Sequence, residues 1–230
     1  MTVPAEAIYE ETDGNMQNSE PAGRKTAKVE WKGGALLAPV PPVLVSCGTW
    51  EHPNVLTVAW TGILSTHPPK TYISLRPSRY SYGLIRASGE FAVNLTTAKM
   101  VRAADFCGVR SGRDVDKFTA TGLEPERAGR VACPGIRQSP VRLECRVTDI
   151  VPLGSHDMFL ADIVAVCVDE RFIDADGRLR LENAGLAAYA HGGYFELGRR
   201  LGNFGFSVCK KSAARPPRGG GPAGGRSQHI

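Results

Sequence analysis

A seven-residue run, Arg76-Pro77-Ser78-Arg79-Tyr80-Ser81-Tyr82, carries the residue types most suited to binding an anion. It follows an extended segment, Thr71–Leu75, and precedes a segment with helical spacing. The first N–H groups of a helix have no intrahelical partner, and guanidinium and hydroxyl groups donate to phosphate oxygens. The run therefore predicts a phosphate-binding site. The alternative is that a serine only caps the helix while the arginines are solvated, and the local pattern leaves both open.

Short strands and turns surround this run. Apolar residues predict strands at 43–47, 55–60, 71–75 and 91–95, with a turn at 51–54 that favours antiparallel pairing. A helix is predicted from Ser81 to Ser88 with Gly89 as its stop, and another from Thr96 or Thr97 to about Phe106. The polar segment 111–118 follows, and polar excursions between packed elements often carry function.

Two longer strands are predicted in the second half of the chain. Residues 140–149 alternate strictly, which predicts one face in the core and Arg142, Glu144 and Arg146 on a solvated face. Residues 158–168 are almost continuously apolar, which predicts burial on both faces. Residues 154–157 form the tight link between them.

The composition predicts three parts. Residues 1–28 form an acidic arm and residues 211–230 an Arg/Gly/Pro tail, both expected to be disordered. Residues 29–210 form one domain, mainly β with a few helices, because short strands dominate and no regular βαβ alternation occurs. The pattern alone leaves an antiparallel barrel or a sandwich open.

The net charge of +5 belongs to the chain ends. Residues 1–25 hold five acidic and two basic residues, and residues 199–230 hold seven basic and no acidic ones. Removing these from the totals of 28 basic and 23 acidic residues leaves 19 and 18. We therefore expect no nucleic-acid binding by the domain.

Cysteine spacing and hydropathy indicate the compartment. The six cysteines lie at least twelve residues apart, so zinc-knuckle and Cys-x-x-Cys spacings are absent, and we expect no metal site. The N-terminal residues are acidic, unlike a signal peptide, and no run of eighteen apolar residues occurs. We expect a cytoplasmic protein with free thiols and no membrane segment.

Several blocks together resemble a known family. They are Asn54 with Thr57–Ser65, Arg76–Ser81, Phe91–Leu95, Ser111-Gly112 with Asp116–Phe118, and Gly154–Asp157. Their order and spacing over about residues 40–205 resemble the flavin reductase-like, FMN-binding split-barrel family, and within it the flavoredoxin-like subgroup. The resemblance implies a six-stranded antiparallel Greek-key split β-barrel with flanking helices. It also implies a homodimer with FMN near the subunit interface.

The resemblance assigns roles to individual residues. It places one group beside the flavin ring: Asn54, Thr57, Val58, Ala59, Trp60 and Thr61. It places Arg79 and Ser81, with Ser78, at the phosphate, and it adds Ser74, Arg76 and Asn94 to the cofactor-binding set. Lys117 and His156 correspond to flavin-contacting residues with a catalytic role, and Tyr189 to an aromatic residue near the ring.

Lys117 and His156 also suit this role chemically. Reduced flavin carries negative charge at its pyrimidine end, and a nearby cation stabilises that charge and raises the reduction potential. Other interpretations remain: Lys117 as a solvated partner of Asp114 or Asp116, His156 as a surface residue, and Trp60 as a core residue.

Three functions remain open at this stage. The first is an NAD(P)H-dependent flavin (FMN) oxidoreductase that passes electrons to free flavin, oxygen, a partner oxygenase or a redox protein. The second is a flavoredoxin-like electron carrier with tightly bound FMN and no direct NAD(P)H oxidation. The third is a noncatalytic binding protein on the same barrel. The sequence does not distinguish NADH from NADPH.

Overall fold

The computed structural model describes residues 27–208 and divides the chain into two units, 1–36 and 37–230. Within the first unit, residues 27–36 contain no helix or strand. Nearly all of the expected arm 1–28 and all of the expected tail 211–230 lie outside the described residues. Between residues 27 and 208, no helix is both long and apolar enough to cross a membrane.

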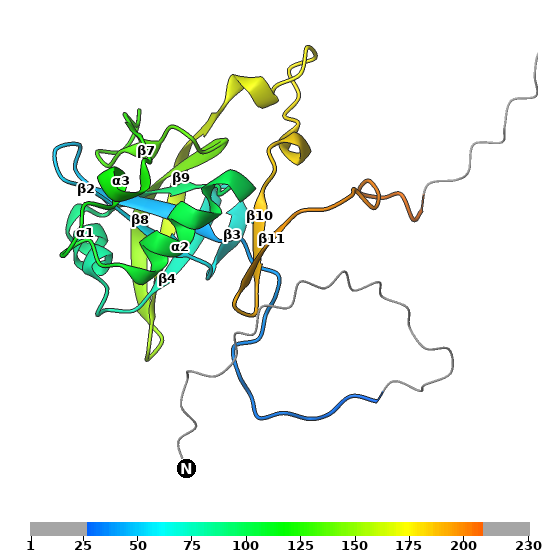
Figure 1. Cartoon of the computed structure of the whole chain (residues 1–230), viewed down its shortest axis with the longest axis horizontal. Coiled ribbons are helices and arrows are strands. Elements are labelled where there is room, and N and C mark those ends of the chain that lie inside the picture. Colours follow the sequence, from blue (N-terminus) through cyan, green and yellow to red (C-terminus); the bar gives the residue numbers. More distant parts are fainter. Residues whose placement is uncertain (1–26, 209–230) are drawn as a thin grey trace, which may run out of the picture. The chain divides into compact units, whose positions relative to one another are not determined.

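One antiparallel sheet organises the second unit (Figure 1). Its order is β2-β1-β5-β8-β9-β4-β3. The bounds are β1 Val43–Gly48, β2 Pro53–Val58, β3 Thr61–Thr66, β4 Pro69–Leu75, β5 Glu90–Asn94, β8 Val141–Pro152 and β9 Asp157–Val168. The mainly β split-barrel prediction is confirmed, with seven strands in an open sheet instead of six.

The additional strand is β3, where the sequence predicted only a connection. Thr61 pairs with Ile73 of β4, and the Thr61 hydroxyl donates to the Tyr72 carbonyl at 2.5 Å. The Thr71 hydroxyl donates back to the Gly62 carbonyl at 2.9 Å. One threonine on each strand thus donates to a backbone carbonyl of the other strand. These side-chain hydrogen bonds add to the backbone pairing of β3 with β4.

The main core lies between the sheet and helix α1 (Tyr80–Ser88). Phe91, Phe159 and Ile85 are fully buried there. Gly89 ends α1 with a φ of +69°, and its N–H donates to the Ile85 carbonyl at 2.8 Å, which confirms the predicted glycine stop. This packing fixes the start of α1 beside the end of β4.

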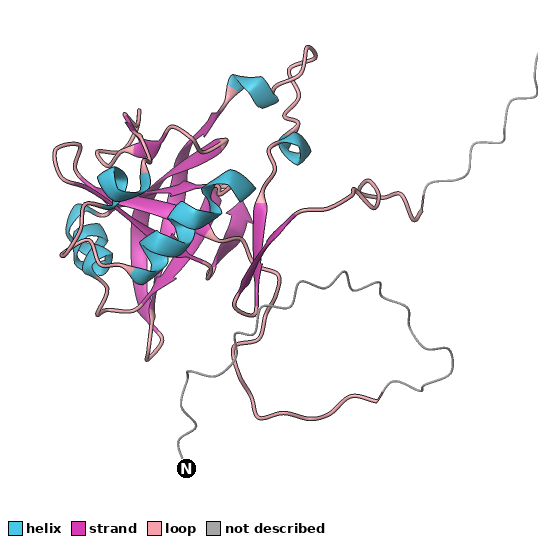
Figure 2. Cartoon of the chain, viewed as in Figure 1, coloured by secondary structure: helices cyan, strands magenta, loops and turns pink. Residues whose placement is uncertain are grey.

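A second apolar cluster holds the other helices against β1 and β2 (Figure 2). These elements are η1 Ala98–Met100, α2 Val101–Val109 and α3 Lys117–Thr121. Ala104 of α2 and Phe118 of α3 pack with Leu44 and Val55 of the sheet. The predicted helix after Thr97 is confirmed, but the polar segment 111–118 also contains the start of α3.

The predicted solvated face of β8 is wrong for Arg142 and Glu144, which are 7% and 0% exposed. The segment that carries β6 (Pro125–Glu126) and β7 (Gly135–Ile136) covers them. Glu144 accepts hydrogen bonds from the N–H groups of Gly129 at 3.1 Å and Arg130 at 2.6 Å. The alternation predicts which residues share a face, but not that an earlier segment of the chain covers that face.

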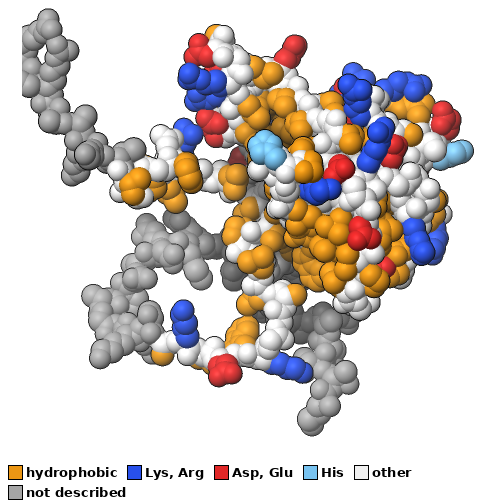
Figure 3. Space-filling view, turned by 180° about the vertical axis from the view of Figure 1, so that it is seen from behind, with side chains coloured by type: hydrophobic (Ala, Val, Ile, Leu, Met, Phe, Trp, Pro, Cys, Tyr) orange, Lys and Arg blue, Asp and Glu red, His pale blue; other side chains and the backbone are white. Residues whose placement is uncertain are grey.

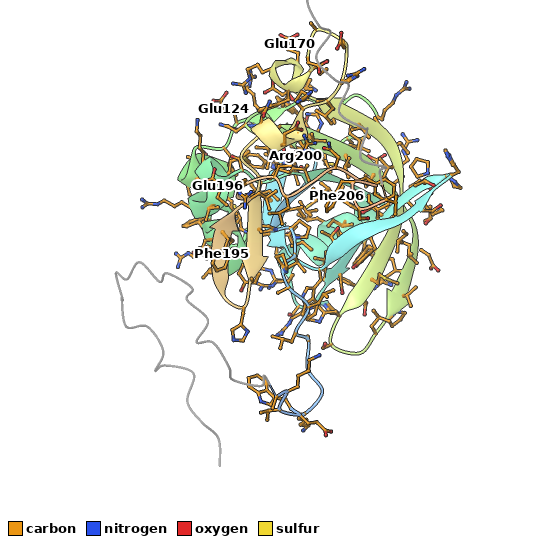
Figure 4. The ribbon with its side chains drawn as sticks, turned by 90° about the vertical axis from the view of Figure 1, so that its right-hand side faces the viewer. Glu124, Glu170, Phe195, Glu196, Arg200 and Phe206 are labelled. Carbon is orange, nitrogen blue, oxygen red and sulfur yellow. The ribbon has the colours of Figure 1, made fainter. Side chains whose placement is uncertain are left out.

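Burial of β9 on both faces is also wrong, because Val166 is 57% exposed and most of the strand is only half-buried. The remaining elements are η2 Glu170–Phe172, η3 Leu181–Asn183, β10 Ala187–Ala190 and β11 Gly193–Glu196. The β10–β11 hairpin joins the barrel through Tyr189 N–H to the Val40 carbonyl at 2.8 Å. Figure 4 shows Phe195 and Glu196 on its second strand.

Replacing Glu144 by alanine should lower the free energy of unfolding by about 3 kcal/mol. This is the lower end for a broken buried ion pair, because Glu126 still pairs with Arg142 at 2.7 Å. Urea denaturation measures the change. Glu124→Ala is the matched control, since its pair with Arg137 is mostly exposed and contributes little. Equal losses in both variants would contradict a structural role for Glu144.

Glu144→Ala should also change the pH dependence of the free energy of unfolding. Burial alone would raise the pKa of Glu144, but hydrogen bonds from Gly129 and Arg130 outweigh it and hold the pKa below its usual 4.5. The folded state therefore binds this proton less readily than the unfolded state. Its contribution is present above pH 4.5 and is lost as the pH falls through the lowered pKa. Glu144→Ala should flatten the acid limb of the stability profile.

Candidate functional site

A cavity of about 390 Å³ lies where the end of β4, the start of α1, and the loop after α2 meet. We call it the cationic cavity. Its polar lining comes from three segments: Arg76, Ser78, Arg79, Tyr80 and Ser81; Arg110, Ser111, Gly112, Arg113 and Asp114; and Lys117. The predicted phosphate-binding run thus lines a cavity, with residues 76–80 exposed at its surface and Ser81 buried.

The charge of this cavity is unbalanced. Four arginines and Lys117 face one carboxylate, Asp114. Within residues 27–208, none of these arginines forms a salt bridge. Like charges held together repel one another, and an anion relieves that repulsion. The first turn of α1 adds backbone N–H groups at the same place.

Ser81 is held in position by a buried amide. The Asn54 Nδ2 donates to the Ser81 Oγ at 2.7 Å and lies 3.7 Å from the Cys47 sulfur. Because the Ser81 oxygen accepts from Asn54, its own proton remains available to a ligand in the cavity. Asn54 therefore reaches the cationic cavity through Ser81.

Gly112 allows the loop after α2 to approach this pair. A Cβ at Gly112 would lie 2.2 Å from the Asn54 Oδ1 and 3.0 Å from the Tyr80 Cδ1. The first distance is shorter than real Cβ contacts, and the second is a tight contact that requires a small shift of Tyr80. Any side chain at this position must displace Asn54, and with it the hydrogen bond that orients Ser81.

Lys117 is 4% exposed, and its ammonium donates to the carbonyls of Val55 and Cys107, both at 2.8 Å. The interpretation of Lys117 as a solvated partner of Asp114 or Asp116 is wrong. Asp116 instead caps α3 by accepting from the Thr119 N–H at 3.2 Å. Burial lowers the pKa of Lys117, and the positive charge of Arg79 adds to that effect. An ammonium has three protons, so one remains for a ligand.

A smaller cavity of about 150 Å³ adjoins the first and shares Leu56, Thr57, Arg76 and Arg79 with it. We call it the aromatic cavity. Its other lining residues are Val58, Ala59, Trp60, Ser74, Leu75 and His156. The backbone is also used here, because the Ser74 N–H donates to the Trp60 carbonyl at 3.0 Å.

Two rings form the aromatic wall. The ring centroids of Trp60 and His156 lie 4.6 Å apart, and Trp60 is 45% exposed, so the alternative of a core tryptophan is wrong. The His156 Nδ1 lies 2.9 Å from the Ser155 Oγ, which leaves Nε2 for a ligand. Burial lowers the pKa of His156, and Arg76 and Arg79 lower it further. These effects favour a neutral imidazole when no anion is bound.

Four predicted cofactor-binding residues line neither of these two cavities: Asn54, which reaches the cationic cavity only through Ser81, and Thr61, Asn94 and Tyr189. Thr61 bonds the β4 backbone, and Tyr189 packs edge-on against Tyr194 with ring centroids 5.2 Å apart. Asn94 is fully buried, and its amide donates to the Leu44 carbonyl and accepts from the Ile136 N–H, both at 3.0 Å. These contacts give Asn94 a structural role between β1 and β7.

The loop after α2 supplies site residues that the sequence did not identify individually. Arg110 and Arg113 line the cationic cavity, and the Arg113 guanidinium lies 5.7 Å from the centre of the Tyr80 ring. The only signal for them was the polar segment that starts at Ser111. Their convergence with Arg76 and Arg79 depends on the packing of α2 against β2, which no local pattern reports.

Comparison with known proteins identifies similar folds and sequences. The flavoredoxin of Desulfovibrio vulgaris (Miyazaki F) superposes with a TM-score of 0.72 at 29% identity, covering 77% of this chain and 97% of that one. An FMN-binding protein from Thermus thermophilus superposes with a TM-score of 0.62 at 26% identity, covering 75% and 94%. An NADPH-flavin oxidoreductase of Streptomyces viridifaciens is 29% identical over 140 residues, which are 59% of this chain and 70% of that protein.

The family model described as "Flavin reductase like domain" matches residues 36–198. This range contains all three segments that line the cationic cavity and both rings of the aromatic cavity. The match covers well over half of the chain. The chain therefore belongs to the flavin reductase-like family.

Proposed function

We propose that the two cavities bind FMN and that the protein is an NAD(P)H-dependent flavin oxidoreductase. The observation that carries this proposal is that the two cavities adjoin. The cationic cavity contains four arginines that form no salt bridge within residues 27–208, next to the first turn of α1, and the aromatic cavity has Trp60 and His156 on its wall. FMN has an anionic phosphate at one end and an aromatic ring system at the other, which matches a charged cavity beside an aromatic one. When bound, the flavin supplies the hydride and electron chemistry.

The residues divide the binding work between the two ends. Arg79 and Ser78 offer charged and hydroxyl donors to the phosphate, and Ser81 offers the proton that Asn54 leaves free. Trp60, Ala59 and Thr57 line the side where the ring would lie. The Thr57 hydroxyl donates to the Ala104 carbonyl, which fixes that wall to α2.

Lys117 and His156 are the groups suited to controlling charge. The Lys117 ammonium forms no salt bridge within residues 27–208, so its third proton would be available to a bound anion and would stabilise negative charge that develops there. Burial and the nearby arginines lower the pKa of His156, whereas an anion beside the free Nε2 would oppose this effect and favour protonation. Both effects favour the reduced, more negative ligand.

We also propose a cytoplasmic homodimer. Large apolar side chains remain exposed on β3 and β9, with exposed fractions of 64% for Ile63, 45% for Leu64 and 57% for Val166. Figure 3 shows hydrophobic side chains gathered in a broad patch on one face of the molecule. Exposed patches of this kind are typical of interaction surfaces. A partner oxygenase or redox protein is the proposed acceptor of the electrons.

The likeness to a flavoredoxin supports a second candidate function. In that function the protein keeps its FMN and exchanges electrons with another protein, without oxidising NAD(P)H directly. The two functions use the same site and differ in whether the flavin leaves.

Purified protein with added FMN should oxidise NADH or NADPH faster than FMN alone. Spectrophotometry at the nicotinamide band measures the rate, and the visible spectrum after gel filtration reports retained flavin. Turnover together with loss of the yellow colour supports the reductase. A retained flavin spectrum without nicotinamide oxidation would favour the carrier. Absence of any flavin binding would reject both.

Arg79→Ala should weaken FMN binding far more than riboflavin binding, because riboflavin lacks the phosphate. A charge-assisted contact is worth roughly 1.5 to 3 kcal/mol, or about a tenfold to hundredfold change in Kd. Calorimetric titration of both ligands measures this. Arg137→Ala is the control, since Arg137 is exposed and lies outside both cavities. Equal loss for both ligands would place the phosphate elsewhere.

Gly112→Ala should weaken FMN binding while leaving a folded protein. The new Cβ must displace Asn54, which frees Ser81 from its fixed orientation. Overpacking of this kind costs about 1 to 3 kcal/mol of stability. Gly83→Ala is the matched control, because Gly83 lies within α1 with open space around it and alanine there should stabilise by about 0.5 to 1 kcal/mol. An unchanged FMN affinity in Gly112→Ala would show that Ser81 does not hold the phosphate.

A further inference from the structure

The turn that carries His156 joins β8 to β9 and is itself exposed. Residues 152–155 are all exposed, and Gly154 has a φ of +94°. The Leu153 N–H donates to the His156 carbonyl at 2.9 Å, which closes the turn within the β8–β9 hairpin. Burial of the turn therefore does not fix where the His156 ring lies, although that ring forms part of the wall of the aromatic cavity.

The residue that follows His156 is bonded to helix α1. The Tyr82 hydroxyl donates to the Asp157 Oδ2 at 2.6 Å, and the Tyr82 ring packs edge-on against Phe159 with ring centroids 5.1 Å apart. Tyr82 is only 8% exposed. The hydrogen bond to Asp157 raises the pKa of Tyr82 above its usual 10, which keeps the hydroxyl protonated as a donor. Tyr82 thereby fixes the start of β9, one residue from the His156 ring.

Tyr82 also belongs to the first turn of α1. Its N–H donates to the Arg79 carbonyl at 3.0 Å, and Ser81, which lines the cationic cavity, directly precedes it. Asp157 pairs in turn with Leu75, the last residue of β4. One side chain thus joins the segment that lines the cationic cavity to the turn that carries a ring of the aromatic cavity.

We propose that Tyr82 is a positioning residue for the flavin ring, because its hydrogen bond to Asp157 holds His156 beside Trp60 on the wall of the aromatic cavity. Tyr82 itself lines neither the aromatic nor the cationic cavity. Side chains that contact a ligand work only when other residues hold them in place. The effect on the flavin rests on the proposed function, whereas the placement of His156 does not.

Proton NMR of the full-length protein without flavin tests the placement of His156. The Trp60 ring, with its centroid 4.6 Å from that of His156, should displace the His156 ring resonances from the positions of an exposed histidine. His156→Gln identifies these resonances by removing them. Tyr82→Phe keeps the ring on Phe159 but removes the hydroxyl, so most of the displacement should be lost. Unchanged His156 resonances in Tyr82→Phe would overturn the proposal.

Tyr194→Phe is the matched control for this experiment. It also removes a hydroxyl bonded to an aspartate, because the Tyr194 hydroxyl donates to the Asp105 Oδ1 at 3.4 Å, and it lies outside both cavities. The His156 resonances should keep their displacement in this variant. An equal loss in both variants would show that Tyr82 has no specific role.

A second pair of variants decides the case in which Tyr82→Phe does not fold. Asp157→Asn keeps an oxygen that accepts from the Tyr82 hydroxyl, so it should preserve the displacement of the His156 resonances. Asp157→Ala removes the acceptor and should lose the displacement. The same resonances in both variants would contradict the proposal, because the hydrogen bond would then have no influence on His156.

Calorimetric titration with FMN and riboflavin tests the effect on the ligand. His156 lies at the proposed ring end, which both ligands share, so Tyr82→Phe should weaken both by the same factor. We expect about a threefold to tenfold rise in Kd, the effect of one lost hydrogen bond to the ligand. A general disturbance of α1 would instead weaken FMN more than riboflavin, because α1 carries Ser81 at the proposed phosphate end. That result, or unchanged affinities, would reject the positioning role.

Failure of this inference is distinguishable from failure of the proposed function. Flavin binding by the unaltered protein, together with unchanged His156 resonances in Tyr82→Phe, overturns the role of Tyr82 and leaves the flavin site in place. Absence of flavin binding by the unaltered protein rejects the proposed function and with it the effect on the flavin. The NMR comparison still decides, in that case, whether Tyr82 places His156.

Discussion

The candidate site depends on one buried cation. The Lys117 ammonium joins three elements, because Lys117 begins α3 and donates at 2.8 Å to carbonyls of β2 and α2. It has no carboxylate partner within residues 27–208. Burying a charge without a counterion is unfavourable unless dipoles compensate for it, and here two backbone carbonyls do so. The remaining positive potential is directed to the cavity that Lys117 lines.

The geometry around this cation explains why a glycine occurs in the polar segment after α2. A Cβ at Gly112 would overlap the Asn54 amide, so any side chain there must displace Asn54. Close approach brings Arg110 and Arg113 to the arginines that precede α1. Four guanidinium groups gathered in this way destabilise the empty site, and a bound anion removes the repulsion. Relief of this electrostatic repulsion therefore contributes to the affinity for an anionic ligand.

Local signals explain which parts of the structure could be predicted. The Arg76–Tyr82 run was found because charge, hydroxyl groups and a helix start occur together in seven residues. Glu144 was misassigned because the segment that covers it lies some fifteen residues earlier, at Gly129 and Arg130. Arg110 reaches the site only through the packing of α2 on β2. The local sequence pattern contains no information about such tertiary contacts. The periodicity of a strand predicts which side chains share a face of the sheet, whereas tertiary packing determines which segment covers that face.

The dimensions of the aromatic cavity bear on the proposed homodimer. Its volume of about 150 Å³ is below the roughly 300 Å³ of most small-molecule sites, and Trp60 on its wall is 45% exposed. A flat ring system has two faces to shield from water, and Trp60 and His156 lie together, with ring centroids 4.6 Å apart. The exposed apolar residues of β3 directly follow Trp60 in the sequence. An interface formed by β3 would therefore cover the open side of the ring, so that dimerisation and completion of the flavin site become one event.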